Sequence, residues 1–436
     1  MTKIERRTFL QASGAGFASF VLPFPRDHLA RAFAGEEEKR PTLVVIFLRG
    51  GADALNVVVP YADERYHELR PTIAIPAESS AEQPGVLPLD DEFGLHPALA
   101  SLLPAWKEKR LAPILNVGSP HPTRSHFDAQ DFMEYAAPGL RTVRAGWLNR
   151  YLAHADRAKA KKSAPAKPDG LRVLAMQGLL PRSLRGEVPV LAVPEKRVLG
   201  DEKLLDVFGP LYGEKAKAEP GDPSADGAGM GAGREETDPV LAAGRDTVEA
   251  LARYRAIVNG SEEGAGNYPA GRFGAALRDL ARVIRAGEEL ELAAIDLTGW
   301  DTHIDQGGAR GAMAELLRNL SDSLAAFMDD LGPHKDRTLV LAMTEFGRTC
   351  KENGNYGTDH GHGGLMLLLG GGIAGGKLHG RWTGLDEKSL YERRDLRVTT
   401  DFRDVFAEVL LEHFRFETPS DFFPGYRPER VRKLFV

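Results

Sequence analysis

The sequence predicts an α/β fold with a doubly wound, mostly parallel sheet and helices on both of its faces. Short apolar runs alternate with longer segments of helical periodicity along most of the chain. Glycine-rich breakers bound several of the runs, as is typical of buried strands in a parallel sheet. Acidic and imidazole side chains follow several of these runs, and the carboxyl ends of parallel strands meet at one edge. We therefore expect the functional residues to gather at that edge.

The first 34 residues are predicted to be an export signal. Arg6 and Arg7 precede a weakly apolar segment over residues 12–24, and Ala32-Phe33-Ala34 is suited to cleavage. The arginine pair followed by Phe-Leu resembles the twin-arginine type, which predicts the twin-arginine export machinery as a partner and a periplasmic or secreted protein. The apolar segment is shorter than the roughly 20 residues of a membrane span, so no transmembrane anchor is expected after cleavage. An uncleaved basic helix that acts as an anchor is the alternative.

Composition limits the function classes. The chain has 56 basic and 62 acidic side chains, and removing the first 34 residues changes its net charge from −6 to −9. This acidity argues against nucleic acid as the main partner. Cys350 is the only cysteine, so stability must come from a core rather than from disulfides. We expect residues 41–436 to form a single domain, with a Gly/Ala-rich flexible loop at 215–237.

The first predicted strand of that domain, Leu43 to Leu48, runs into Gly50-Gly51 and then into Asp53. The glycines permit backbone geometry that would deliver the acid to the edge of the sheet. Asp53 is therefore the first candidate metal ligand, with Asn56 in reserve, and an Asx turn is the alternative. Residues 61–100 are expected to be irregular, and His96 before Pro97 is expected to start a helix rather than to act chemically.

The next predicted strand, Leu111 to Val117, leads to a helix that begins near Ser125. Asp128 follows three positions later, in the pattern of a capping box. Free N–H groups at a helix start can bind an anion, which suits a nucleophile. Ser125 is accordingly the candidate nucleophile, with Arg124 and His126 beside it, and the local pattern favours a plain capping role equally. Ser119 and Thr123 are not expected to be the nucleophile.

Two later segments supply the other candidate ligands. Strands are predicted at 171–176, 188–193 and 293–295, and Asp301 and His303 follow the last of them, two positions apart in an extended segment that points both the same way. A helix at 313–331 is core. The strand at 339–343 ends near Glu345, and a loop with Asp359, His360 and His362 precedes the strand at 365–369. Carboxylates and imidazoles at one edge predict a divalent metal, zinc or manganese, as one or two ions.

Six motifs in this order, FLRGGADALNVVVPY, LHPAL, TRSHFDAQDFMEY, GWDTH, TEFGRT and GTDHG, span most of residues 41–415. They resemble the twin-arginine-exported domain-of-unknown-function family 1501, within the alkaline-phosphatase-like and sulfatase-like superfamily. The resemblance implies two metal sites that flank a hydroxyl or formylglycine nucleophile. It places Asp53 and the Asp301-His303 pair among the metal ligands and Ser125 at the start of the nucleophile helix.

The chain also departs from the superfamily pattern. Glu345-Phe346 stands where many members have Asp-His, which leaves Asp359 and His360 to complete the ligand set. No Cys-x-Pro-x-Arg signature is present, so formylglycine chemistry is not expected. The predicted function is an exported metal-dependent hydrolase of small anionic phosphate or sulfate esters, with Arg124 or Arg348 holding the ester oxygens. A non-catalytic exported binding or assembly protein is the alternative.

Overall fold

The computed structural model describes residues 40–160, 170–193, 239–261, 264, 266–430 and 433–436. The expected export signal (1–34) and the expected flexible loop (215–237) lie outside these residues. Arg40 to Val436 form one compact unit, which is built on a large sheet. No helix in the described part of the chain is both long and apolar enough to cross a membrane.

The main sheet has eight strands in the order β11-β5-β10-β9-β1-β8-β6-β7. Neighbouring strands pair in parallel except where β10 pairs with β5 and β9, which it meets antiparallel. The chain adds strands on both sides of β1, so the predicted doubly wound, mostly parallel α/β sheet is confirmed. Its strands are β1 (Thr42–Arg49), β5 (Leu111–Gly118), β6 (Val173–Ala175), β7 (Leu191–Ala192), β8 (Leu292–Thr298), β9 (Thr338–Met343), β10 (Gly364–Gly370) and β11 (Thr400–Asp401).

Strand β1 is apolar at nearly every position because both of its faces are covered. Val44, Ile46 and Leu48 belong to the core on one face of the sheet, and the residues between them belong to the core on the other. Successive side chains point to opposite faces of a strand, so a central strand that is buried on both faces needs apolar residues at successive positions. This explains why the run is continuous rather than alternating.

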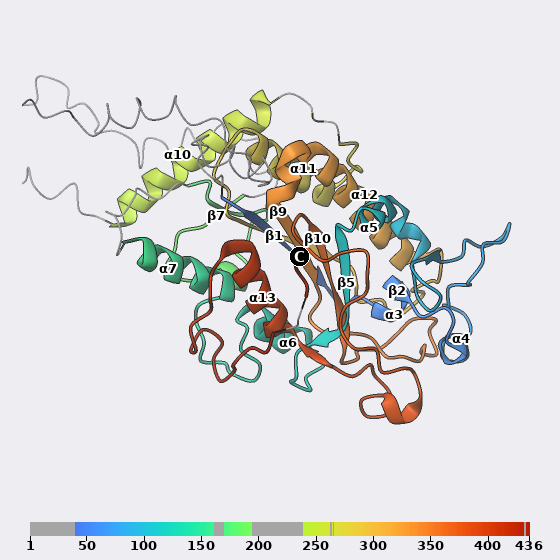
Figure 1. Ribbon diagram of the computed structural model, residues 1–436. Helices are drawn as coiled ribbons and strands as arrows, with labels where there is room; N and C mark the ends of the chain where they lie inside the picture. The colour runs from blue at the N-terminus through green and yellow to red at the C-terminus, as the bar shows by residue number, and fades with distance from the viewer. Residues whose placement is uncertain (1–39, 161–169, 194–238, 262–263, 265, 431–432) are drawn as a thin grey trace, which may run out of the picture. The chain divides into compact units, whose positions relative to one another are not determined.

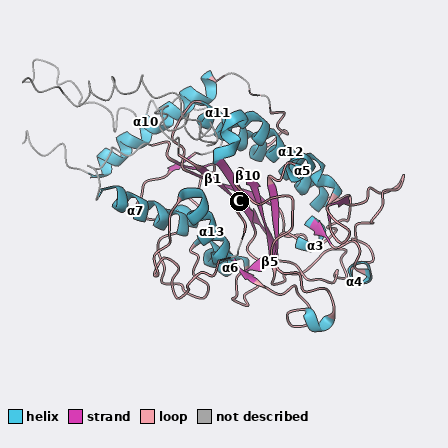
Figure 2. Cartoon of the chain, in the orientation of Figure 1, coloured by secondary structure: helices cyan, strands magenta, loops and turns pink. Residues whose placement is uncertain are grey.

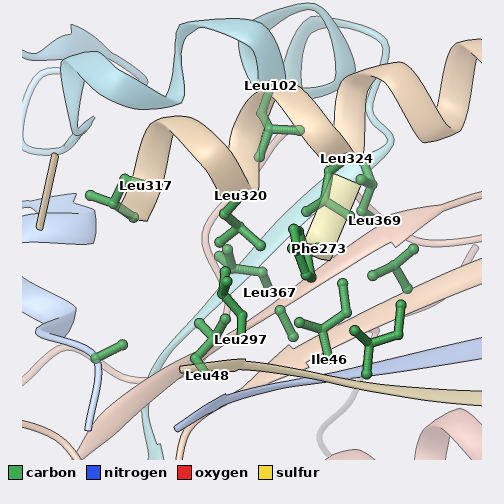
Figure 3. Packing of buried hydrophobic residues seen from close by; sticks show 14 of the residues in the cluster. Ile46, Leu48, Leu102, Phe273, Leu297, Leu317, Leu320, Leu324, Leu367 and Leu369 are labelled. Atoms are coloured by element: carbon green, nitrogen blue, oxygen red, sulfur yellow. The ribbon is translucent and has the colours of Figure 1, made fainter. Parts of the chain in front are cut away.

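Helices cover both faces of the sheet (Figures 1 and 2). One face is covered by α5 (Leu103–Lys107), α10 (Pro239–Gly260), α11 (Arg272–Arg285) and α12 (Ala312–Leu331). The other is covered by α6 (His126–Glu134), α7 (Trp147–Ala160) and α13 (Phe402–Phe414). Figure 3 shows the stripe of Leu317, Leu320 and Leu324 on α12 facing the strands, as its helical spacing predicted. Short 3-10 turns lie at η2 (Arg182–Leu184), η4 (Gly332–Arg337) and η5 (Glu387–Ser389).

The region between β1 and β5 is more regular than the sequence predicted. It contains a second sheet of three short strands, ordered β2-β4-β3, whose members have only two residues each. His96 caps η1, as expected of a positional residue: its Nδ1 accepts the N–H of Ala98 and its Nε2 bonds the Gly308 carbonyl, both at 3.0 Å. The elements here are α3 (Ala54–Val57), β2 (Val58–Val59), α4 (Glu64–Leu69), β3 (Leu87–Pro88), β4 (Gly94–Leu95) and η1 (Pro97–Leu102).

The reversed direction of β10 positions the candidate site. Residues 344–363 leave β9 at its carboxyl end and enter β10 at its amino end. Because the two strands are antiparallel, both ends of this segment lie at the same edge of the sheet as the carboxyl ends of β1 and β8. The residues that follow β1, β8 and β9 and those that precede β10 therefore share one edge.

Candidate metal centre

Three imidazoles and one carboxylate converge at this edge. The Nε2 atoms of His303 and His360 each lie 3.0 Å from Oδ1 of Asp301, and 2.9 Å from each other. Nε2 of His126, from the first turn of α6, lies 3.4 Å from the other carboxylate oxygen of Asp301. Possible ligand atoms of His126, Asp301 and His360 all lie within 4.8 Å of one another. The expected proximity of Asp301 and His360 is thus observed.

The Nδ1 atom of each imidazole contacts an acceptor. His126 faces Glu345 at 2.8 Å, His303 faces Asp359 at 3.0 Å, and His360 faces the backbone carbonyl of Arg124 at 2.8 Å. Carbonyl and ionised carboxylate oxygens can only accept, so each Nδ1 carries the proton. In the neutral rings the Nε2 lone pairs of His303 and His360 then face each other, and Nε2 of His126 faces Asp301. This is how second-shell acceptors orient histidines for a metal ion.

The charges around the cluster favour a cation. With neutral imidazoles, Asp301, Asp359 and Glu345 contribute three negative charges, and Arg348 returns one positive charge. The remaining charge of −2 is that which a divalent ion would neutralise. Nε2 of His126 is also buried and has no hydrogen-bond partner among the described residues. A buried nitrogen without a hydrogen-bond partner that lies near possible ligand atoms of Asp301 and His360 fits a metal-ligand position.

The pKa shifts follow from the same contacts. The hydrogen bond to Glu345 raises the pKa of His126, whereas burial lowers the pKa of His360. Burial alone would raise the pKa of Asp301, but the hydrogen bond and positive charge of Arg348, together with the adjacent imidazoles, outweigh it and bring that pKa to about 2. Burial opposes ionisation of Glu345 as well, and its bonds from His126 and Gln130 still lower its pKa. Both carboxylates are therefore ionised at neutral pH.

Arg348 orients the carboxylate of Asp301 and is not placed to hold a substrate. Its side chain is fully buried, donates to Asp301 Oδ1 at 2.6 Å and bonds four backbone carbonyls. Those carbonyls belong to Gly50, Gly51, Trp300 and Thr358, so the guanidinium joins three loops behind the cluster. The prediction that Arg348 clamps ester oxygens is wrong, because its donors face the protein interior.

Glu345 also has a role other than that of a metal ligand. It is buried, and its carboxylate accepts the backbone N–H groups of Gly50 and Gly51 at 2.9 and 3.2 Å in addition to its bond with His126. Gly50 has a φ of +126°, and a Cβ there would lie 2.4 Å from the Asp301 nitrogen. The two glycines thus let the backbone wrap around Glu345 and approach Asp301. The structure assigns Glu345 to the orientation of His126.

Asp53 and Asn56 lie in a separate buried network, which corrects their prediction as metal ligands. Asp53 pairs with Arg70 at 2.5 and 2.9 Å and accepts from Gln306 at 2.7 Å. Asn56 accepts from Arg70 and Tyr66 and donates to the Ile73 carbonyl. The guanidinium neutralises Asp53, so a metal ion is not needed there. Asp53 is also the N-cap residue of α3 but makes no side-chain capping bond.

Ser125 is the N-cap residue of α6, as predicted, but its side chain makes no capping hydrogen bond. Its side chain is exposed and immediately precedes His126. The side chain of Arg124 is paired with Asp395 at 2.7 Å and with Glu392 at 2.6 Å. The prediction that Arg124 holds ester oxygens therefore needs correction: its carbonyl orients His360, and its guanidinium serves an ion pair.

Several supporting residues were not identified from the sequence. Asp395 is fully buried and joins Arg124 to Arg394, which in turn donates to the His360 carbonyl at 2.7 Å. Asn353 donates to Asp359 Oδ1 at 3.1 Å and to the His303 carbonyl at 3.0 Å. Gln130 donates to Glu345 at 2.9 Å, one helical turn after His126. Only Gln130 had a usable signal, since positions four apart share a helix face.

The donor set fits zinc. Bonds of about 2.0 to 2.2 Å to nitrogen and oxygen place the ligands of a tetrahedral ion about 3.3 Å apart, close to the separations of 2.9 to 3.4 Å found here. Three imidazoles with one carboxylate are also more typical of zinc than of manganese, which prefers oxygen ligands. His126, His360 and Asp301 therefore have atoms close enough together to hold one ion, and His303, next to Asp301 and His360, is a further candidate ligand.

Solved structures show distant likeness to the chain. A sulfatase from Pseudoalteromonas sp. has a TM-score of 0.38 at 10% identity and covers 95% of this chain and 76% of its own. The C-terminal periplasmic domain of EcEptC from Escherichia coli, a complex with zinc, has a TM-score of 0.34 at 10% identity, with coverages of 77% and 74%. A phosphonate monoester hydrolase from Agrobacterium radiobacter has a TM-score of 0.32 at 12% identity, with coverages of 89% and 78%. Likeness at this level does not assign chemistry.

The comparison with curated proteins found no match. The comparison with family models found one, which covers less than half of the 436 residues but includes the GWDTH, TEFGRT and GTDHG motifs. These motifs contain Asp301, His303, Glu345, Asp359 and His360. Residues 242–421 match the model described as "Protein of unknown function (DUF1501)".

Proposed function

We propose that this protein is an exported, metal-dependent hydrolase of phosphate or sulfate esters. The observation that supports the proposal most directly is the convergence of the His126, His303 and His360 Nε2 atoms on Asp301. Asp301 and His303 are 47% and 37% exposed, so a small ester could reach the cluster from solvent. An ion that served structure alone would more commonly be enclosed by its ligands.

In the proposed enzyme His126, His360 and Asp301 would hold a single zinc ion and leave its fourth position open to the ester, with His303 beside them. When bound, that ion would supply Lewis-acid polarisation of an ester oxygen and neutralise its charge. Glu345, Asp359 and the Arg124 carbonyl keep the three imidazoles in the required tautomer, and Arg348 keeps Asp301 ionised and oriented. Among the described residues Asp53 is paired with Arg70 and Gln306 and belongs to no further group of candidate ligands, and one ion is accordingly proposed.

Ser125 remains the proposed nucleophile. Its hydroxyl is exposed, makes no capping bond and lies next to His126 at the start of α6, where free N–H groups favour an anion. In this proposal Ser125 Oγ forms a bond to phosphorus or sulfur and loses its proton to solvent, while the ester alkoxide leaves and takes up a proton. Water then cleaves the serine ester and releases the inorganic anion.

The test combines metal content with turnover. Folded full-length protein should contain about one equivalent of zinc and hydrolyse members of a panel of phosphate and sulfate monoesters. His360→Ala should lose both properties, whereas His154→Gln, a change on α7 at a histidine that contacts aromatic rings, should keep both. Zinc binding without turnover of any ester would favour the alternative, an exported binding or assembly protein. Wild-type protein that binds no zinc would contradict the proposed site.

A further inference from the structure

Large apolar side chains are exposed on the chain segments that carry the candidate metal ligands. Phe127 directly follows His126 and is 82% exposed, and Ile304 directly follows His303 and is 66% exposed. Tyr356, which is 58% exposed, lies three positions before Asp359. Half of the six exposed large hydrophobic residues in the described part of the chain therefore lie on the segments that bear the cluster. The other three are Leu140, Leu179 and Val436.

Backbone contacts hold Ile304 and Tyr356 in neighbouring loops. The N–H of Asp305 donates to the Asn355 carbonyl, and the N–H of Gln306 donates to the Tyr356 carbonyl, both at 2.9 Å. Asn353 ties the same two loops together through the His303 carbonyl. The loop that contains Ile304 and the loop that contains Tyr356 therefore run side by side next to the metal ligands.

Packing does not account for the three exposed residues. None of them belongs to either core cluster of the described residues or packs against one, although each lies within three positions of a residue in the site. A single exposed apolar residue is ordinary, but three of them on the segments that carry a polar, ion-binding cluster are typical of a ligand site with an apolar part. Their small number favours a small ligand over an extended docking surface.

We infer that Phe127, Ile304 and Tyr356 bind the apolar alcohol portion of the substrate, so the preferred esters are amphiphilic. The inference rests on the proposed function: the anionic end of the ester would face the ion held by the imidazoles, and an alkyl or aryl group would cover the apolar side chains. Each methylene removed from water would tighten binding by up to about fourfold. The substrate class is thus an anionic monoester of a hydrophobic alcohol rather than of a sugar.

Non-hydrolysable phosphonates test this inference by binding alone. Calorimetry on the zinc-loaded full-length chain should show that octylphosphonate binds at least about tenfold more tightly than methylphosphonate, with butylphosphonate between them. The triple variant Phe127→Ser, Ile304→Ser and Tyr356→Ser should bind methylphosphonate as the wild type does but lose the dependence on chain length. Val436→Ser is the matched control, because Val436 is 97% exposed and bonds Gly372, beyond the end of β10 at the opposite edge of the sheet.

The outcomes separate this inference from the proposed function. Methylphosphonate binding that needs zinc but does not strengthen with chain length would overturn the apolar contact and leave the ester site intact. Failure of every phosphonate to bind the zinc-loaded chain would overturn both. Two other outcomes would also overturn the inference, both with phosphonate affinity independent of alkyl length. If the wild type binds phosphatidylcholine vesicles and the triple variant does not, the three side chains contact a membrane. If the wild type forms a dimer and the triple variant does not, they contact a second copy of the chain.

Discussion

The Nε2 atoms of His303 and His360 lie 2.9 Å apart, although 57 positions separate the two residues in the chain. Both rings donate from Nδ1, so two lone pairs face each other at hydrogen-bonding distance without a proton that the neutral rings could share. Such a contact is stable only if a proton or a metal ion lies between the atoms. The folded chain therefore holds the two imidazoles in positions that favour binding of a cation between them.

Asp53 and Asp301 both follow strands, but they should respond differently to loss of charge. Asp53→Asn leaves the fully buried guanidinium of Arg70 without its anion, which should lower the free energy of unfolding by about 3 to 5 kcal/mol. Asp301→Asn likewise takes the anion from a fully buried guanidinium, that of Arg348, and should lower the free energy of unfolding too, but it alone should also weaken zinc binding, by at least about tenfold. Urea denaturation and competitive zinc titration on both variants measure the two effects.

The opposite result for the Asp53→Asn and Asp301→Asn variants would contradict the assignment of Asp301 as the metal ligand. Loss of zinc from folded Asp53→Asn with no loss from Asp301→Asn would mean that the ion binds near β1 and that the Arg70 pair opens to admit it.

Ser125→Ala should abolish turnover without destabilising the protein. The Ser125 hydroxyl makes no capping bond, so its removal should change the free energy of unfolding by less than about 0.5 kcal/mol. Loss of the nucleophile should lower kcat by several orders of magnitude. Melting temperature and ester turnover are to be measured on one preparation.

Ser119→Ala and Thr123→Ala are the controls for Ser125. Both hydroxyls accept backbone N–H groups at 3.2 Å, so these changes should cost about 1 kcal/mol of stability and keep turnover. Full turnover in Ser125→Ala would remove Ser125 from the mechanism.

His96 should make the protein less stable in acid. Burial, the main cause, lowers the pKa of His96 from 6.5 to about 4, and a proton on Nδ1 would also oppose the Ala98 N–H that it now accepts. Between these values the unfolded chain binds a proton that the folded chain does not. The free energy of unfolding should therefore fall as the pH is lowered from about 6.5 to 4, by roughly 3 kcal/mol from this group.

His96→Asn isolates that contribution, because Asn can still accept the Ala98 N–H but does not titrate. At pH 6.5 the free energy of unfolding of His96→Asn should be lower than that of the wild type because the Gly308 contact is lost, and this difference should shrink as the pH falls from 6.5 to 4. A difference that is independent of pH across this window would show that His96 titrates normally.

Export should depend on the paired arginines. Replacing Arg6 and Arg7 together by Lys keeps the charge but removes the pair that twin-arginine signals require, so the protein should remain uncleaved in the cytoplasm. Fractionation followed by mass spectrometry of the amino terminus measures this, with Lys3→Arg as a control. Normal trimming and export of the double variant would exclude the twin-arginine route.

The fold was largely predictable because buried strands leave continuous apolar runs. Residues 43–48, 111–117 and 339–343 were each predicted as strands from composition alone, and β1, β5 and β9 lie there. The direction of β10 was not predictable, since an apolar run has the same appearance whichever way the strand points. We expected the site residues to share one edge because the strands were predicted to be parallel. The loop before β10 does lie at that edge, but for a different reason: β10 is antiparallel to its neighbours, so its amino end is there.

The site was predictable in its segments but not in its partners. Asp301, His303 and His360 were recognised because polar residues after or before strands meet at an edge. Asp53 had the same signal, but its partner Arg70 lies on a separate turn whose path the sequence does not reveal. His126 was grouped with the nucleophile rather than with the ligands, because its neighbour in sequence was Ser125 and its neighbours in space lie more than 170 positions away.

The antiparallel return of β10 makes residues 344–363 one cassette that leaves and re-enters the sheet at the same edge. Its two ends join adjacent hydrogen-bonded strands, so changes within it leave the register of the sheet intact as long as Glu345 and Arg348 keep their bonds to the backbone of Gly50 and Gly51. This cassette includes His360 and two of the three carboxylates of the cluster, whereas β1, β8 and α6 supply a fixed frame. Changes within this one continuous segment could therefore alter which ion the cluster prefers, in evolution or by design, without changes to the strands of the sheet.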